Sequence, residues 1–375
     1  MYKHQLVYTV VSICLMFSLR AKNPDQHCNN ADSLSKKDSL SIKRYKIIGL
    51  PLFFYVPETK FGGGGAGIIT WRFKKDSSTV RPSSVQFGVA FTQLKQTLIY
   101  LPFNLWLKND AYNVFGEIGY YKYNFFFWGV GNKQAYNLQE LYDVKFPRLK
   151  INALRRIAPY TYAGVKYNFD DFQVTRVDSL GLLAKGEIAG SKGGRVSSLG
   201  LVVKYDSRDN LFYPTKGYLA ELSYQIDDKK IGASFNNNRF IFDGSTYITT
   251  KFSHTMAFNL YSVIGGGDIP FNQMALLGGT KKMRGFYEGR YRDKNLLMFQ
   301  TEYRAPLFWR LGAVVFISAG DVADKVSNFN ITEFKLAYGG GLRVLLDKKQ
   351  KINIRLDIGW ADPKPNFYLT VTEAF

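Results

Sequence analysis

The sequence has very little of the chemistry on which most enzymes and metal sites depend. It contains only two cysteines, Cys14 and Cys28, and three histidines, His4, His27 and His254. So few thiols exclude a disulfide framework and a thiolate metal site. Only His254 lies in the main body of the chain, and no nucleophile motif accompanies it. The sequence therefore predicts a protein that is not an enzyme and that has no metal or cofactor.

The chain also lacks an N-terminal apolar run long enough to span a membrane as a helix. Residues 6–19 are apolar and follow a weakly basic start, which suits the core of a signal peptide. We assign residues 1–21 to a signal peptide, with a membrane anchor as the alternative. Residues 22–45 are polar and charged and predict a flexible leader. Residues 46–375 then form one domain.

Aromatic residues and glycine are abundant. The chain has 30 Phe, 25 Tyr and 34 Gly, with 46% hydrophobic residues overall. This composition is typical of alternating strands, and of membrane β-barrels in particular, because only half of each barrel strand faces lipid. The formal net charge of +20 indicates an anionic partner. No zinc-finger spacing, basic helix or compact basic run points to nucleic acid, so anionic lipid headgroups are the expected partner.

Apolar and polar residues alternate with a period of two from Tyr45 to the end of the chain. In residues 352–360, for example, isoleucine, leucine and tryptophan alternate with asparagine, arginine, aspartate and glycine. Such strands fit a soluble sandwich or a transmembrane barrel. Many segments run about ten residues or more, which is the length that crosses a bilayer, whereas sandwich strands are usually about half as long. Strand length therefore favours the barrel.

The strand number follows from the length of the domain. At roughly twenty residues per strand and connection, residues 46–375 give about sixteen antiparallel strands, an even number as in single-chain bacterial barrels. We expect the strands to centre near residues 50, 69, 88, 101, 118, 150, 164, 200, 222, 242, 259, 300, 315, 340, 356 and 371. Tryptophans near the strand ends are expected to form an interfacial girdle: Trp106, Trp128, Trp309 and Trp360.

Two connections are expected to be long, residues 128–143 and 265–294. The second contains the irregular stretch 278–286, in which three glycines accompany three basic residues and an aromatic. A loop of this length could fold back into the barrel, with Gly285 allowing a tight turn and Arg284 reaching acidic residues in the lumen. The alternative is an exposed basic loop that touches lipid headgroups.

Charged residues on the strands must face the lumen. They are Glu302, Arg304, Arg355 and Asp357. An arginine facing lipid at mid-bilayer would cost about 2–4 kcal/mol, whereas opposite charges inside the barrel offset one another. The alternative is a generic polar lining of the lumen without a specific role.

Two further stretches resemble functional motifs. Residues 62–67 are glycine-rich but lack the Lys-Ser/Thr ending of a phosphate loop, so a flexible turn or a strand opening is the better interpretation. Residues 205–210 lead to Pro214-Thr215-Lys216-Gly217, which predicts a polar hairpin turn. Alternation places Asp206 and Arg208 on the lumenal face, where they could pair.

These residues together resemble the BamA/TamA family of bacterial surface antigen barrels. The resemblance covers nearly all of the chain after about residue 46. The matching positions are the loop lock Gly278, Gly279, Arg284, Gly285 and Phe286, the hairpin motif Asp206, Arg208, Asp209, Pro214 and Gly217, the strand 302–307, and the C-terminal strand signal Phe375.

The resemblance implies a bacterial outer-membrane barrel with sixteen strands and an inward-folded loop whose Arg284 binds acidic lumenal residues. Members of the family insert barrel proteins or move polypeptides across the membrane. Implied partners are unfolded barrel-protein clients and a separate periplasmic protein. The implied mechanism is a weak seam between the first and last strands, with local thinning of the bilayer.

The sequence departs from the family pattern in two places. The family usually has a Phe-x-Asp-x-Gly pattern, and residues 316–320 of this chain have Ser318 in place of the aspartate. Strand alternation places the nearby Asp321 on the other face of the strand. Glu302 and Asp357 are therefore the expected partners of Arg284. In addition, residues 22–45 are too few to hold a packed periplasmic POTRA domain.

Two other functions compete with insertion or translocation of polypeptides. The charged lumenal faces would also suit a passive channel for small solutes. A hydrolase with His254 as the base is the weaker alternative, because only one histidine is available and no nucleophile motif accompanies it.

Overall fold

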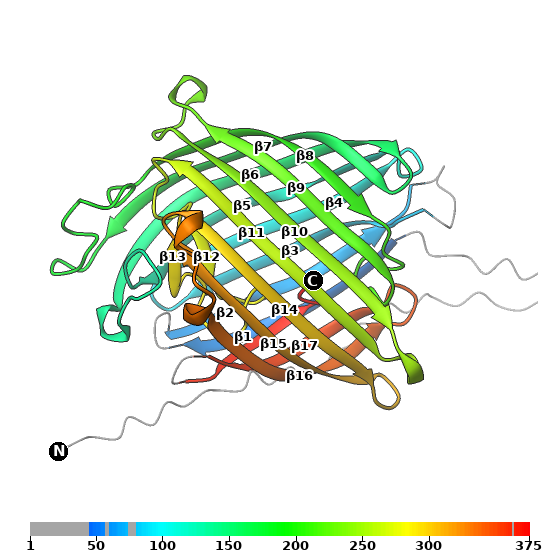
Figure 1. The fold of residues 1–375 in the computed structure, drawn as a ribbon. Helices are drawn as coiled ribbons and strands as arrows, with labels where there is room; N and C mark the ends of the chain where they lie inside the picture. Colours follow the sequence, from blue (N-terminus) through cyan, green and yellow to red (C-terminus); the bar gives the residue numbers. More distant parts are fainter. Residues whose placement is uncertain (1–44, 57–59, 74–79, 362–363) are drawn as a thin grey trace, which may run out of the picture.

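The computed structural model describes residues 45–375 apart from 57–59, 74–79 and 362–363. The expected signal peptide and leader lie outside the described residues, except for Tyr45. Sixteen strands form one antiparallel sheet in which neighbours in the chain are neighbours in space, and the sheet curls into a barrel (Figure 1). The prediction of an all-β, sixteen-stranded antiparallel barrel is confirmed.

Every expected strand centre falls inside a barrel strand. These strands are β1 (Tyr45–Val56), β2 (Lys60–Trp71), β3 (Ser83–Thr92), β4 (Thr97–Leu107), β5 (Tyr112–Phe127), β6 (Glu140–Ala158), β7 (Thr161–Arg176), β8 (Gly194–Asp206), β9 (Gly217–Asp227), β10 (Asn237–Thr249), β11 (Thr255–Gly267), β14 (Asn295–Pro306), β15 (Leu311–Ala323), β16 (Lys335–Asp347), β17 (Ile352–Trp360) and β18 (Asn366–Val371).

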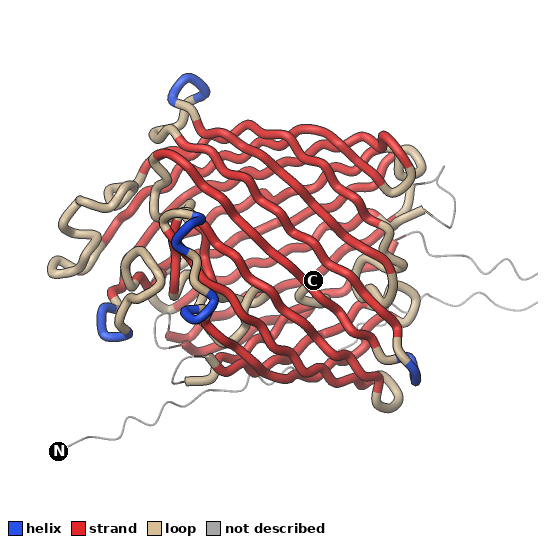
Figure 2. The backbone as a smooth tube through the Cα atoms, in the orientation of Figure 1, coloured by secondary structure: helices blue, strands red, loops and turns tan. Residues whose placement is uncertain are grey.

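The connections differ in length at the two ends of the barrel (Figure 2). One end carries short turns such as 159–160 and 348–351, whereas the other carries the segments 128–139, 177–193 and 268–294. In outer-membrane barrels the short turns face the periplasm. Two of the long connections were expected, but 177–193 was not.

Short elements occupy some of these connections. A separate two-stranded sheet joins β12 (Ala275–Leu277) to β13 (Tyr291–Asp293) within the segment 268–294. The short 3-10 helices are η1 (Tyr136–Leu138), η2 (Lys229–Ile231), η3 (Lys251–Ser253), η4 (Val326–Asn328) and η5 (Ile331–Glu333). Across the described residues, no helix is long and apolar enough to cross a membrane.

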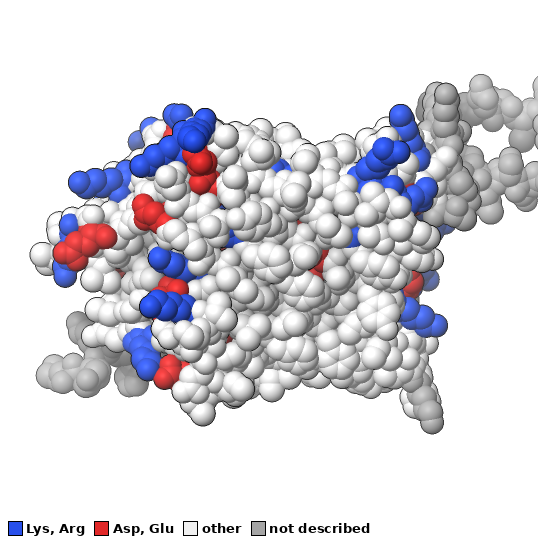
Figure 3. All heavy atoms as spheres, turned by 45° about the horizontal axis from the view of Figure 1, so that its top comes forward, with Lys and Arg blue, Asp and Glu red and all other residues white. Residues whose placement is uncertain are grey.

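The outer surface is an apolar band between charged rims. On β8, for example, Leu201 and Val203 are exposed, while Val202 between them and Lys204 beside them are buried. Charged side chains gather near both ends of the face in Figure 3, and uncharged atoms cover the middle. Apolar-out and polar-in alternation is the pattern of a barrel whose exterior contacts lipid.

The expected tryptophan girdle is half wrong. Trp309 and Trp360 are exposed, but Trp106 and Trp128 are fully buried. Cations explain the inward position of Trp106, because Arg81 and Lys204 lie 4.7 Å and 5.6 Å from its ring centroid. A buried indole face stabilises such cations where water is scarce.

The glycine run opens a strand and is not a turn, which confirms one of the two expected alternatives. Residues 62–65 lie inside β2 and pair with both β1 and β3. A Cβ atom on Gly64 would come within 1.9 Å of the carbonyl oxygen of Val89, and one on Gly67 within 2.4 Å of that of Ile48. The glycines are needed there because neighbouring backbones approach closely.

A charge on the apolar band should destabilise the barrel in a depth-dependent way. Ile317 is exposed in the middle of β15, and Leu307 is exposed just beyond the end of β14. We expect Ile317→Arg to lower the free energy of unfolding in lipid by about 2–4 kcal/mol and Leu307→Arg by about 0–1 kcal/mol, measured by reversible denaturant titration. Equal effects at both depths would contradict the lipid-facing assignment.

An inward loop held by a buried charge network

The connection 268–294, hereafter the inward loop, packs inside the barrel. Leu277, Met283 and Phe286 are buried in one apolar cluster with residues of the inner barrel wall. The wall residues of this cluster are Val263, Leu296, Met298, Val322 and Ala337. The structure therefore answers what the sequence left open, and places the loop in the lumen. Burial of these side chains fixes the loop against β14, β15 and β16.

Glycines permit the path of the inward loop. Gly278, Gly279 and Gly285 have φ values of 108°, 106° and 125°, a region that other residues rarely adopt. A Cβ atom on Gly285 would lie 2.9 Å from Ala361, so the loop also approaches β17 too closely for a side chain. These constraints explain why this stretch contains no regular element between β12 and β13.

Arg284 is the anchor of the inward loop. Its side chain is 1% exposed and forms ion pairs with Glu302 of β14 and with Asp357 of β17, the latter at 2.5 Å. Its Cζ atom also lies 3.7 Å from the ring centroid of Phe316 on β15. A planar guanidinium can bind two separate carboxylates at once, which lysine cannot do in the same way. Arg284 thus ties the loop to two strands.

Three more arginines extend this charge network, which we define as Arg284, Glu302, Arg304, Arg343, Arg355, Asp357 and Glu373. Arg304 contacts Glu302 at 2.8 Å, and Arg343 contacts both Asp357 at 2.6 Å and Glu373 at 2.8 Å. Arg355 lies 3.5 Å from Asp357. All seven side chains are buried. Removing one member would leave an uncompensated charge in a place without bulk water.

The expected lumenal partners all meet in this network, but two members were not predicted. Arg343 is the one charge in the interior of β16, between Lys335 and Asp347 at its ends, and the cost of facing lipid would have assigned it to the lumen. Glu373 follows the last strand, where no periodicity exists to place it. Ser318 donates a hydrogen bond to the carbonyl of Ala337 instead of contacting the loop. Asp321 is fully buried, and Asn132 from another loop donates to it.

Side chains of the last strand also hold the backbone of the inward loop. Gly285 N–H donates to the hydroxyl of Tyr368 at 2.9 Å, and that hydroxyl donates to the carbonyl of Phe286. Asn366 donates its amide to the carbonyl of Gly285 at 2.5 Å. Both side chains belong to β18, so the position of the loop and the position of the last strand depend on each other.

Phe375, which the resemblance implies to be a C-terminal strand signal, lies beyond the end of the last strand. β18 ends at Val371, and the chain then turns so that the Phe375 carbonyl accepts a hydrogen bond from Arg304 at 3.0 Å. Its ring centroid lies 5.5 Å from the same guanidinium. The attraction of a buried arginine for a carbonyl and an aromatic ring accounts for this inward turn.

The hairpin motif closes the short-turn end near the network. Asp206 is fully buried between Arg208 at 2.9 Å and Arg81 at 3.0 Å, of which Arg81 was not predicted. Gly217 has a φ of 96°, and the carbonyl of Pro214 accepts a hydrogen bond from a network arginine.

Asp209 holds this turn together. Its carboxylate accepts from the amide and hydroxyl of Thr215 and from the amide of Lys216. Partial burial alone would raise the pKa of Asp209, but these hydrogen bonds outweigh it and keep the pKa below its ordinary value. The carboxylate therefore stays ionised and the turn stays closed at neutral pH.

Together, the apolar band, the short turns and the inward loop define an outer-membrane β-barrel with a loop locked in its lumen. A family model, the Omp85 superfamily domain, matches residues 74–375, and the chain belongs to this superfamily. The predicted resemblance is confirmed at this level, and so is the predicted location in the bacterial outer membrane. No curated protein matches the chain.

Solved structures show the same fold at low sequence identity. BamA from Haemophilus ducreyi lacking POTRA domains 1-3 matches with a TM-score of 0.53 and 16% identity, over 87% of this chain and 68% of that one. CdiB from Escherichia coli matches with a TM-score of 0.54 and 11% identity, over 87% and 61%. CdiB from Acinetobacter baumannii gives 0.52 and 12%, over 88% and 59%. The chain thus spans about three fifths of each CdiB chain.

Loss of the Arg284 side chain should loosen the barrel. Arg284→Ala leaves Glu302 and Asp357 without their shared partner, so we expect a loss of about 3–5 kcal/mol in stability. The measurement is the temperature at which the folded band disappears in a heat-modifiability gel. Lys282→Ala is the matched control in the same loop. The Lys282 side chain is partly exposed, and its ion pair with Asp243 is long, at 3.8 Å. If Arg284→Ala melted like the control, Arg284 would not be the anchor.

Proposed function

We propose that this protein assists the insertion of polypeptides into the outer membrane or their translocation across it. The observation that carries the proposal is the coupling between the anchored inward loop and the last barrel strand. Clients of the proposed function are unfolded barrel proteins, delivered by a separate periplasmic partner. The charged rims of the barrel would contact anionic lipid headgroups.

The seam between the first and last strands supports this function. β18 is short and pairs with β17 over residues 366–371. Within the part of the chain that the structure describes, no hydrogen-bonded ladder joins β1 to β18. Ile48 of β1 and Val371 of β18 nevertheless pack against the same buried cluster. Backbone groups at such an edge can pair with an incoming strand.

The first half of β2, next to the seam, has few side chains that can pack. Residues 62–65 of β2 are all glycine and pair with the middle and end of β1. Glycine gains more conformational freedom than other residues when a segment is released. We therefore expect the glycine segment of β2 to yield more easily than a strand with larger side chains, as an opening seam requires.

Opening of the seam would change the contacts of the anchored loop. A client strand that displaces β18 would disturb the hydrogen bonds that join Asn366 and Tyr368 to Gly285 of the inward loop. Arg284 would keep the rest of the loop on β14 and β17 meanwhile, so that the barrel stays intact while its edge exchanges.

Two features of the lumen favour polypeptide handling over a passive channel. The inward loop fills part of the interior, and the turn 207–216 contacts the network at the other end through Pro214. A hydrolase receives little support, because His254 lies at a short turn and its Nδ1 is hydrogen-bonded to the hydroxyl of Tyr303. We propose that the protein has no enzymatic activity.

Insertion can be tested with the purified protein in liposomes. An unfolded barrel protein is added, and the rate at which it becomes folded and protease-resistant is compared with that in protein-free liposomes. We expect clear acceleration, reduced in Arg284→Ala and unchanged in Lys185→Ala, whose side chain is exposed on a distant loop. A rate no faster than in protein-free liposomes, together with large steady conductance in planar bilayers, would replace the proposal with a channel.

A further inference from the structure

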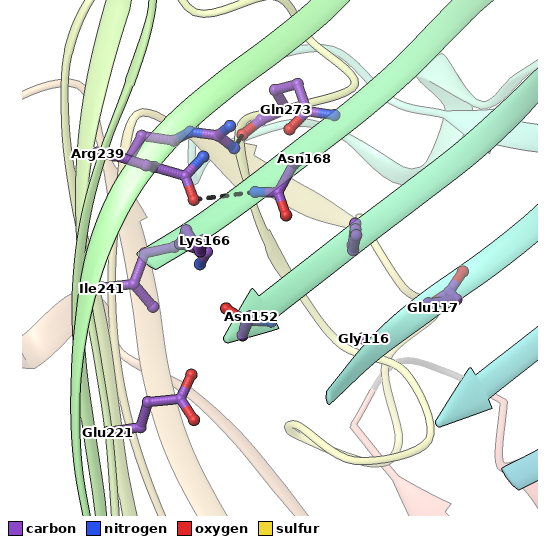
Figure 4. Close-up of a pocket in the computed structure, with 11 residues that line it drawn as sticks. Gly116, Glu117, Asn152, Lys166, Asn168, Glu221, Arg239, Ile241 and Gln273 are labelled. Atoms are coloured by element: carbon purple, nitrogen blue, oxygen red, sulfur yellow. Dashed lines mark hydrogen bonds between the residues drawn. The ribbon is translucent and has the colours of Figure 1, made fainter. Parts of the chain in front are cut away.

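A second group of polar side chains lines a cavity of about 280 Å³ in the lumen. The cavity lies along β5, β6, β7, β9 and β10, with Gln273 of the inward loop at its edge (Figure 4). It is much larger than the roughly 10–15 Å³ that one water needs. None of the charge-network residues lines it, so it is a separate feature of the lumen.

Two lysines form the cationic part of this cavity. In the register of β6 and β7, Lys150 lies opposite Asn168 and Lys166 lies opposite Asn152. The lysines therefore occupy one diagonal of a four-residue patch, at a separation that long side chains bridge easily. Both ammonium groups can reach one small ligand that lies over the patch.

Among the described residues, neither lysine forms a direct ion pair, although Glu221 lies near Lys166, and Glu117 and Asp170 lie near Lys150. Lys166 donates only to the hydroxyl of Ser223, at 3.4 Å. Glu117, which lies opposite Lys150, is engaged by the hydroxyl of Tyr121 and by Arg148. Two partly buried ammonium groups that lack a direct ion pair are unfavourable, and a bound anion would offset that cost.

Two further side chains have polar atoms without a partner in the described structure. Asn152 is 7% exposed and donates its amide to the carbonyl of Phe115, which leaves its Oδ1 unpaired. Arg239 is also 7% exposed, and its terminal nitrogens bind Gln273 and Asp227 while its Nε is unpaired. Buried polar groups are normally satisfied, so such atoms indicate an absent ligand or water.

The unpaired groups define the chemistry of the ligand. Two ammonium groups and a guanidinium N–H call for an anionic group, whereas Asn152 Oδ1 and the carboxylate of Glu221 accept hydrogen bonds. An inorganic anion alone would satisfy only the first set. We propose that the cavity binds a small polyhydroxylated anion, namely a sugar that carries a phosphate or a carboxylate. This site is independent of the proposed insertion function.

Calorimetric titration of the purified full chain in detergent tests the site. The probes are glucose 6-phosphate, glucuronate, glucose and inorganic phosphate. We expect the two charged sugars to bind at least about tenfold more tightly than glucose, because each hydrogen bond to a charged group is worth about that factor. Inorganic phosphate should bind more weakly than glucose 6-phosphate. Absence of binding by both charged sugars, or equal affinity for glucose, would overturn the proposal.

Variants separate direct binding from damage to the barrel. Lys150→Met and Lys166→Met should each weaken glucose 6-phosphate binding at least about tenfold, whereas Lys150→Arg retains the charge and most of the affinity. Lys185→Met on the loop 177–193 is the control. Glu221→Gln removes a negative charge from the cavity and should tighten phosphate binding. Each variant must migrate as a folded barrel on unheated gels. Unchanged affinity in both Lys→Met variants would overturn the proposal.

Discussion

The ion pairs of Arg284 are the interaction on which the interior of this barrel depends. One guanidinium joins a loop to two strands, β14 and β17, and it does so where water is scarce. A buried pair of charges contributes little net stability compared with apolar packing, but it is costly to break. The pairing therefore acts mainly as a constraint on position. It permits one placement of the inward loop and penalises the alternatives.

That constraint extends to the barrel wall through the neighbours of Arg284. Asp357 also binds Arg343 of β16, and Glu302 also binds Arg304, which holds the chain end at Phe375. The backbone next to Arg284 is bound by β18. The loop, the wall and the end of the chain are thus joined at one place, close to the seam. A weak edge beside a rigid anchor is the combination that strand exchange without collapse would need.

The sequence predicts the fold and most of the charge network because both depend on local rules. Strand alternation fixes which face is polar, and the cost of charge in lipid assigns Glu302 and Asp357 to the lumen. Parity alone cannot distinguish an interfacial tryptophan from one that covers a cation, so Trp106 was misplaced. The backbone approach at Gly64 and the inward turn of Phe375 depend on residues distant in the chain. No local pattern encodes those contacts.

The positive charge of the chain is a second case in which composition alone does not predict where side chains lie. A net charge of +20 suggested anionic lipid outside the barrel, because composition does not record which side of a strand a residue occupies. The register of β6 and β7 places Lys150 and Lys166 inside, together with Arg239. In the charge network, carboxylates accompany the arginines, whereas the cavity lysines have no ion pair among the described residues. The proposed anion in the lumen would account for part of the excess positive charge.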